Sequence, residues 1–188
     1  MKVKVGLLLI TLVLVIAAEQ ASPAAGAWPG MPDLPPDWQI TAATLADVTG
    51  DGADEWVLLV WRPWRDWPIQ QWSEVPSPIA GFHDAEGNSC HLILLDPQDG
   101  REIWAGSALP VPFLSLIVDD VDGDGFNEVL TVEGRYADGH SGRGTHIDVW
   151  SWNGFGFTMD WRSPPGDFDP SCLANADRCG LQAISDKF

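Results

Sequence analysis

The stretch Asp120-Val-Asp-Gly-Asp-Gly-Phe-Asn-Glu128 lies between two short apolar segments, residues 113–118 and 129–132. Carboxylates occupy its positions 1, 3, 5 and 9, and glycines occupy positions 4 and 6, where a tight turn requires backbone freedom. Alternate side chains of such a loop point inward, where a hard cation can collect roughly six to eight oxygen ligands. The spacing therefore predicts a calcium-binding loop. Its expected ligands are the side chains of Asp120, Asp122, Asp124 and Glu128 and the carbonyl of Phe126.

Two other structures can carry an acidic loop of this kind. An EF-hand requires a helix on each side and a bidentate glutamate at position 12 of the loop, but position 12 here is Thr131. The flanking segments are short and rich in β-branched residues, so we expect the loop to join two strands. A solvated hairpin turn is the second alternative, although turns seldom carry acids at every alternate position.

The pattern occurs a second time, earlier in the chain, as Asp47-Val-Thr-Gly-Asp-Gly-Ala-Asp-Glu55. A shift of 73 residues, from 47 to 120, superposes the acids at positions 1, 5 and 9 of the two loops. Position 3 is Thr49 where the later loop has Asp122, and this removes one formal charge. We therefore expect two calcium loops, of which the later one binds more tightly. The aligned acids of the earlier loop are Asp47, Asp51 and Glu55.

The N-terminal residues 1–27 have the composition of a secretory signal peptide. Lys2 and Lys4 precede an apolar core at 5–18, and Ala25-Gly-Ala27 offers small residues for cleavage. This apolar core is short for a membrane helix, so an uncleaved anchor is the less favoured alternative. The expected location is secreted or periplasmic, with no membrane span in the mature chain.

The chain carries 27 acidic and 10 basic residues among 188, a formal net charge of −17. Such an excess of negative charge disfavours binding to nucleic acid, because phosphate contacts need clustered basic side chains. Many of the acids are concentrated in the two loops. Cations are therefore the expected small partners.

After residue 27 the chain is long enough for one domain with its own core. Residues 28–39 are rich in proline and are expected to form an extended lead-in, 40–165 a β-repeat domain, and 166–188 an irregular tail. Cys172 and Cys179 are close in sequence, and a disulfide between them would fix this tail. We expect Cys90 to be a buried free thiol, although the sequence alone leaves the pairing of the three cysteines open.

Short apolar segments predict two repeats of four strands, at about 40–106 and 113–162. In each repeat the acidic loop joins the first two strands, an irregular connection follows, long and proline-containing in the first repeat and shorter and glycine-rich in the second, and a hairpin completes the unit. The turn Asn153-Gly154 between alternating apolar residues is a strong hairpin signal. The fold is therefore expected to be all-β. The predicted strands are 40–46, 55–61, 91–96, 101–105, 113–118, 128–133, 146–152 and 155–161.

With both loops placed between strands, residues 40–162 resemble the FG-GAP, or integrin α-chain-like, β-propeller repeats and the related bacterial repeat proteins of the VCBS type. The resemblance rests on the two acidic loops and on the hairpins 92–104 and 147–161. It implies a structural calcium ion between the first two strands of each blade. It also adds Thr49 and the carbonyl of Ala53 to the ligands of the first loop, and it implies a role in extracellular binding or adhesion.

The sequence departs from those repeats in two respects. It has no clear Phe-Gly and Gly-Ala-Pro signature, and it offers two blade-like units where a closed propeller has roughly four to eight. Two blades cannot close a ring. We therefore expect a partial propeller, in which the two sheets pack as a small sandwich or their edges are covered by self-association or by another β-repeat chain.

The connection at 62–89 opens with several tryptophans on what is expected to be a surface loop. Exposed aromatic rings beside Arg and Asp can bind a glycan, because ring faces stack on the apolar faces of sugars. They can equally contact a protein, or fold back and cover a small β core. The candidate ligand-binding residues are Trp61, Trp64, Trp67 and Trp72.

No nucleophile elbow, phosphate loop or Cys-His arrangement occurs in the sequence. The paired acids lie in the two loops, where a metal would keep them ionised and unsuited to proton transfer. We therefore expect a secreted calcium-binding protein that binds an extracellular protein or glycan rather than an enzyme. The alternatives are a secreted enzyme or accessory subunit with a Trp-rich carbohydrate-binding loop, and a purely structural component of the cell envelope.

Overall fold

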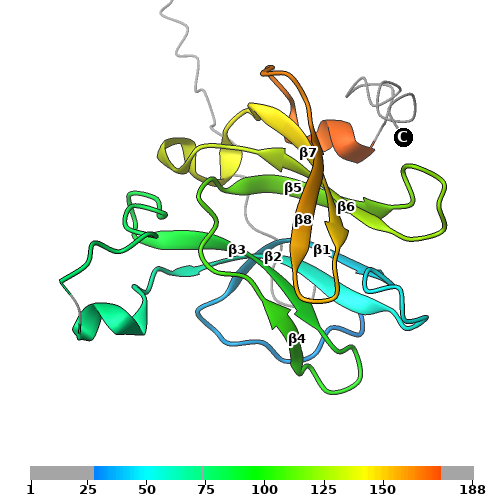
Figure 1. The fold of residues 1–188 in the computed structure, drawn as a ribbon, viewed down its shortest axis with the longest axis horizontal. Coiled ribbons are helices and arrows are strands. Elements are labelled where there is room, and N and C mark those ends of the chain that lie inside the picture. Colours follow the sequence, from blue (N-terminus) through cyan, green and yellow to red (C-terminus); the bar gives the residue numbers. More distant parts are fainter. Residues whose placement is uncertain (1–27, 73, 175–188) are drawn as a thin grey trace, which may run out of the picture.

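The computed structural model describes residues 28–72 and 74–174, so the predicted signal peptide lies outside the described residues. This part of the chain forms eight β-strands and three short 3-10 helices (Figure 1). The predicted all-β fold is confirmed, and the strands begin and end within a few residues of the predicted positions. The strands are β1 (Gln39–Ala46), β2 (Glu55–Pro63), β3 (Asn88–Leu95), β4 (Glu102–Ala105), β5 (Phe113–Asp119), β6 (Glu128–Glu133), β7 (His146–Trp152) and β8 (Phe157–Arg162).

The strands form two four-stranded antiparallel sheets, each built from consecutive strands. Sheet A has the order β1-β2-β3-β4, and sheet B has the order β5-β6-β7-β8. In each sheet the first pair is joined by one acidic loop, with Ala46 opposite Glu55 in sheet A and Asp119 opposite Glu128 in sheet B. Within the described residues neither sheet closes into a barrel, so the molecule has the two blade-like units that the sequence predicts.

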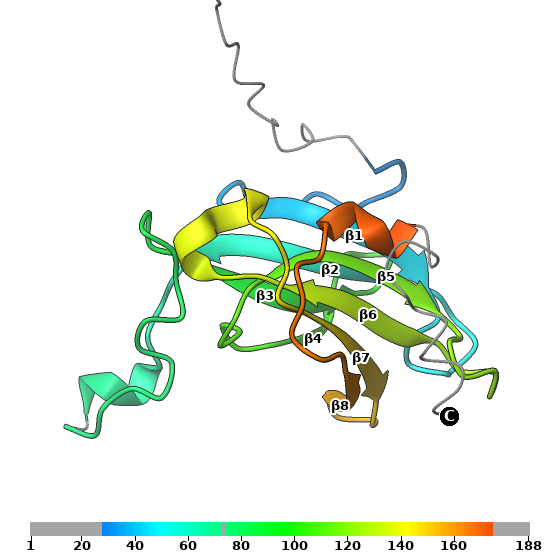
Figure 2. The ribbon, with the colours of Figure 1, turned by 90° about the horizontal axis from the view of Figure 1, so that it is seen from above.

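The two sheets pack against each other over an apolar core (Figures 1 and 2). Strand β1 lies against β5, and the core is filled from the facing sides of both sheets. At one margin Trp104 of sheet A packs edge-on against Trp152 and Phe157 of sheet B, with ring centroids 6.1 and 5.3 Å away. The buried residues of this core are Val48, Val57, Leu59, Trp61, Cys90, Leu92, Leu94, Phe113, Leu116 and Val129.

The outer face of sheet A is covered by the N-terminal lead-in. Strand β2 is a continuous apolar run, and its alternate side chains Trp56, Leu58 and Val60 are buried on the side away from sheet B. Side chains of the proline-rich segment, among them Trp28 and Trp38, pack against this side. The lead-in is therefore a layer of the folded domain and does not act as a spacer.

The outer face of sheet B is covered by the segment that follows β8. The 3-10 helix η3 (Pro170–Ala174) buries Cys172 and Leu173 against β6 and β7, and Phe168 forms a β-bridge with Gly144. The segments before β1 and after β8 therefore cover the apolar outer faces of the two sheets.

The connection between β2 and β3 projects from one end of sheet A, with the 3-10 helix η1 (Pro68–Gln71) near its tip (Figure 2). A third short helix, η2 (Tyr136–Ser141), lies in the corresponding connection of the second repeat. None of the helices in the described part of the chain is long and apolar enough to cross a membrane.

Candidate metal sites

In the first acidic loop three carboxylates converge. Oxygen atoms of Asp47, Asp51 and Glu55 lie within 4.8 Å of one another. The Asp47 carboxylate also accepts hydrogen bonds from the backbone N–H groups of Gly50, Asp51 and Gly52 at 2.7, 3.2 and 2.9 Å, so the loop wraps around it. Asp47 Oδ1 accepts two of these hydrogen bonds and Oδ2 accepts one, so Oδ2 keeps a lone pair for a cation. The donor set is entirely oxygen, and this fits a hard cation.

Glu55 closes the first loop from its far end. It is only 2% exposed, and its Oε2 atom accepts hydrogen bonds from the N–H groups of Val48 and Thr49 at 3.0 and 3.2 Å. The hydroxyl of Thr49 donates to Oε1 at 3.1 Å. Thr49 therefore lies beside the cluster and its hydroxyl helps hold Glu55 in place, while its predicted role as a metal ligand stays a prediction.

In the second loop a different set of acids converges. Oxygen atoms of Asp120, Asp122 and Asp124 lie within 4.8 Å of one another, and all three side chains are exposed. Asp120 accepts hydrogen bonds from the N–H groups of Gly123 and Gly125 at 2.7 and 3.1 Å. Glu128, also predicted as a ligand, is not in this cluster. Its Oε2 atom accepts a hydrogen bond from the N–H of Val121 at 3.1 Å.

The two loops share one backbone conformation. Gly50 and Gly123 have φ angles of 75° and 80°, and Gly52 and Gly125 have φ angles of 89° and 92°. These values lie in the left-handed region, which a side chain makes costly. At position 7 the N–H groups of Ala53 and Phe126 donate to the preceding aspartates, Asp51 and Asp124, at 2.9 and 2.8 Å. That their carbonyls ligate a metal stays a prediction.

The loops also touch each other. The side-chain amide of Asn127, in the second loop, donates to the carbonyl of Asp47 at 2.8 Å. The ring of Phe126 lies over Gly50, so close that a Cβ atom on Gly50 would be 2.8 Å from it. Sequence reasoning missed this contact, because Asn127 occupies position 8, where the first loop has Asp54, and nothing in the pattern marks it. The two candidate sites are therefore neighbours on one end of the molecule.

Burial and nearby charge perturb the glutamates. Desolvation, together with the neighbouring aspartates of its loop, raises the pKa of Glu128 to about 7, against the hydrogen bond from Val121. Desolvation also raises the pKa of Glu55, but three hydrogen bonds to its charged form oppose that shift. A cation at either loop would favour the ionised form of these groups.

The tryptophans of the insertion do not form one surface. Trp61 was predicted on the surface, and this is wrong: it belongs to β2, is 1% exposed and lies in the core between the sheets. Its position on the inward side of the pleat explains the burial. Trp64 is half-buried beside His83 and donates its Nε1–H to the carbonyl of Ile79 at 3.2 Å. Trp67 and Trp72 are exposed, at 44% and 85%.

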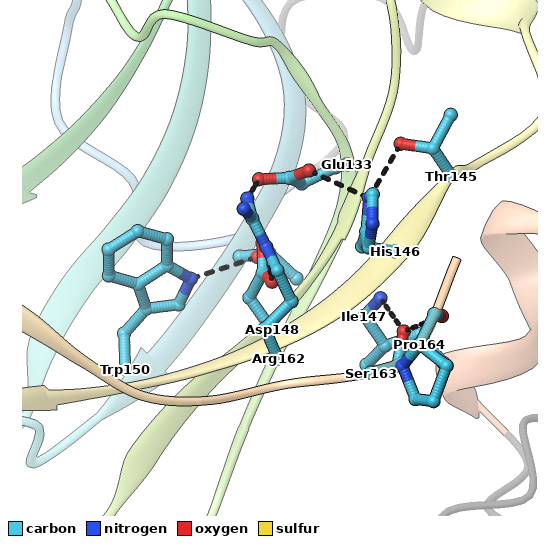
Figure 3. Close-up of polar contacts among 10 residues, drawn as sticks. Glu133, Thr145, His146, Ile147, Asp148, Trp150, Arg162, Ser163 and Pro164 are labelled. Carbon is cyan, nitrogen blue, oxygen red and sulfur yellow. Dashed lines mark hydrogen bonds and ion pairs between the residues drawn. The ribbon is translucent and has the colours of Figure 1, made fainter. Parts of the chain in front are cut away.

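A buried charge cluster in sheet B was not anticipated from the sequence (Figure 3). The guanidinium of Arg162 on β8 lies between the carboxylates of Glu133 on β6 and Asp148 on β7, with Nε 3.0 Å from Asp148. His146 Nδ1 is 3.2 Å from Glu133. Burial, together with the charge of Glu133, raises the pKa of Asp148 to about 7 despite the hydrogen bond from Arg162. The cluster ties three strands together, which is a structural role.

Of the cysteines in the described residues, one is a buried thiol and one is disulfide-bonded. Cys90 is free and fully buried, and this burial raises the pKa of its thiol to about 12. Cys172 is buried in η3 and disulfide-bonded. Its predicted partner, Cys179, lies outside the described residues.

Comparison with family models, with curated proteins and with solved structures finds no match for this chain. The resemblance to FG-GAP and VCBS-type repeats therefore stays a prediction that rests on the two loops and on the strand order. The donor sets described above support a more general statement, that two acidic clusters of this fold could hold metal ions.

Proposed function

We propose that this protein is an exported, calcium-stabilised β-repeat protein that binds an extracellular partner. The observation that carries the proposal is the convergence of three carboxylates in each of two loops that have the same backbone conformation. Like charges at such separations repel by about 1 kcal/mol per pair even in water, and a bound cation removes this cost. Turn formation alone gives no reason to place the same repulsion twice.

Calcium is the proposed ion because the donors are all oxygens held on flexible, glycine-containing loops. Magnesium demands near-ideal octahedral geometry and gives up its water reluctantly, and zinc favours nitrogen and sulfur ligands. In the first loop the ligands are Asp47, Asp51 and Glu55 with Thr49. In the second they are Asp120, Asp122 and Asp124. Glu128 is the proposed fourth ligand, because a cation would offset its repulsion by these aspartates.

We propose binding rather than catalysis because the acidic side chains that converge, within the described residues, belong either to the two loops or to the cluster around Arg162. The loop acids would be held ionised by a metal, and the cluster acids are covered by protein. The partner is an extracellular protein or a glycan, as the resemblance implies. Self-association through the edge strands of the two sheets is part of the same proposal and is testable by light scattering.

The test is thermal unfolding of the protein in EDTA and in a calcium titration, with magnesium as the control ion. Calcium at about a hundred times its dissociation constant adds roughly 2.7 kcal/mol per site, which is several degrees for a domain of this size. We expect calcium to raise the midpoint more than magnesium does at equal concentration. A midpoint that is the same in EDTA and in millimolar calcium would reject the proposal.

A further inference from the structure

A groove at one end of sheet A has the chemistry of a ligand site. Its volume is about 530 Å³, and it lies where the lead-in, the end of β2 and the projecting insertion meet. We call it the Trp38 groove. Its lining includes Trp38, Trp67, Arg62, Arg65, Asp37 and Asp66.

Two indole rings line this groove from different parts of the chain. Trp67 comes from the insertion and is 44% exposed, so it offers a free apolar surface. Trp38 comes from the lead-in and is half-buried, and the guanidinium of Arg62 lies 5.3 Å from its ring centroid. Aromatic rings that edge a polar groove stack on the apolar C–H faces of sugars.

The charged side chains of the groove balance one another. Arg62 and Arg65 supply two positive charges, and Asp37 and Asp66 supply two negative charges, in a chain whose net charge is −17. One ion pair joins two of these four groups, Arg65 and Asp37 at 3.8 Å, and that pair is exposed and weak. The groove therefore offers both donors and acceptors without a net charge, which matches the many hydroxyl groups of an uncharged ligand.

The guanidinium of Arg62 is the groove's donor best placed to bond to a ligand. It makes no ion pair within the described residues, and its closest polar contact is His91 Nδ1 at 3.4 Å. That nitrogen is 3.0 Å from the carbonyl of Gly106, and Nε2 is 2.8 Å from the hydroxyl of Ser89. Nδ1 therefore carries the proton that goes to Gly106 and cannot accept from Arg62. Burial lowers the pKa of both Arg62 and His91, so Arg62 is a partly desolvated cation beside a neutral imidazole.

We propose that the Trp38 groove binds an uncharged saccharide, with Trp67 and Trp38 stacking on sugar rings and Arg62, Asp37 and Asp66 bonding to hydroxyl groups. This inference deepens the proposed binding role, because it names the class of partner. It does not depend on calcium, because the groove shares no residue with the acidic loops. An acidic saccharide would meet Asp37 and Asp66, and a proline-rich peptide would leave the charged groups unused.

The experiment is binding of the protein to an array of uncharged oligosaccharides of glucose, mannose, galactose and N-acetylglucosamine, followed by calorimetry on those retained. Acidic oligosaccharides and a proline-rich peptide are included on the array. We expect Trp67→Ala to weaken binding at least tenfold without lowering the melting temperature, because its ring is exposed. Trp38→Ala is also expected to weaken binding, and Trp38→Phe to restore part of it if the domain stays folded. Trp72→Ala, an exposed tryptophan outside the groove, is the matched control and should bind as the wild type does.

Three results would overturn the inference. They are no retention of any uncharged oligosaccharide at millimolar concentration, retention that Trp67→Ala leaves unchanged, and a preference for the acidic sugars or the peptide. Repeating the calorimetry in EDTA separates this inference from the calcium proposal. If the protein binds sugar but its melting temperature does not change with calcium, the groove proposal stands and the metal-site proposal is rejected.

Discussion

The two acidic loops have the same backbone but gather different carboxylates. In the first loop Glu55, at position 9, joins the cluster, and in the second loop Glu128 stays outside it. The difference follows from position 3. Thr49 donates its hydroxyl to Glu55 and holds it in the loop, whereas Asp122 in the same place can only repel Glu128. In the metal-free loops position 3 therefore favours the acid at position 9 in the first loop and disfavours it in the second.

The largest expected difference between the loops is in their pH dependence without metal. The folded-state pKa of Glu128 is raised from 4.5 to about 7, so its contribution to stability is fully present below about pH 4.5 and is lost as pH rises through 7. Glu128→Gln removes that loss. In EDTA the variant should gain about 1–3 kcal/mol relative to the wild type between pH 4.5 and pH 8, measured by urea unfolding.

Glu55→Gln is the matched control for this experiment. Its pKa is also raised, but three hydrogen bonds to the charged carboxylate limit the shift, so its relative gain over the same pH range should be smaller. Equal gains for the two variants would mean that the loops do not differ at position 9 as described.

The next largest effect concerns the aspartates that hold the loop backbones by hydrogen bonds. Asp47 accepts three backbone N–H groups and Asp120 accepts two, and Asp120 is also one of three exposed clustered acids. In EDTA Asp47→Ala should therefore cost about 1–2 kcal/mol of unfolding free energy, and Asp120→Ala less, because removing it also relieves repulsion. Asp54→Ala, in the same loop but outside the cluster, should change stability by no more than about 0.5 kcal/mol. If Asp120→Ala proves the costlier change, this ranking is wrong.

Exchanging position 3 should exchange the calcium affinities. Thr49→Asp adds a carboxylate to the first loop and should raise its affinity by on the order of tenfold, about 1.4 kcal/mol, while Asp122→Thr should lower that of the second loop by a similar factor. Calorimetric titration of each variant measures both changes. Unchanged affinities would show that position 3 does not face the ion.

The smallest effect concerns the contact between the loops. Asn127→Ala removes the hydrogen bond to the carbonyl of Asp47 and should cost about 0.5–1 kcal/mol in urea unfolding. Asn127→Asp should cost more in EDTA, because it removes the donor and adds a charge beside the clustered acids. A neutral result for both variants would mean that the loops are independent.

Much of the fold could be predicted because its signals are local. The β-branched segments, the paired glycines and the Asn153-Gly154 turn each specify backbone conformation over a few residues, and these strands and turns are found in the structure. The two loops were found for the same reason. Their acids recur at fixed spacing within nine residues.

What the sequence could not give depends on contacts between distant residues. Trp61 lies within β2, close to the start of the insertion, so only the point where that strand ends decides whether this residue belongs to the core or to the insertion. In the sequence the lead-in looks like a linker, because prolines separate its apolar side chains. Only the folded structure shows that these side chains pack against the outer face of sheet A. In the sequence Arg162, Glu133 and Asp148 look like charged residues on the solvent side of their strands. Only the pairing of β6, β7 and β8 brings them together.

The central claim is that each loop binds one calcium ion, and isothermal titration calorimetry of calcium into the protein tests it most directly. We expect two sites per chain, with Asp124→Ala removing the tighter one and Asp51→Ala removing the weaker one, so that each variant retains a single site. An absence of calcium binding to the wild type, or a stoichiometry that neither substitution changes, would contradict the account.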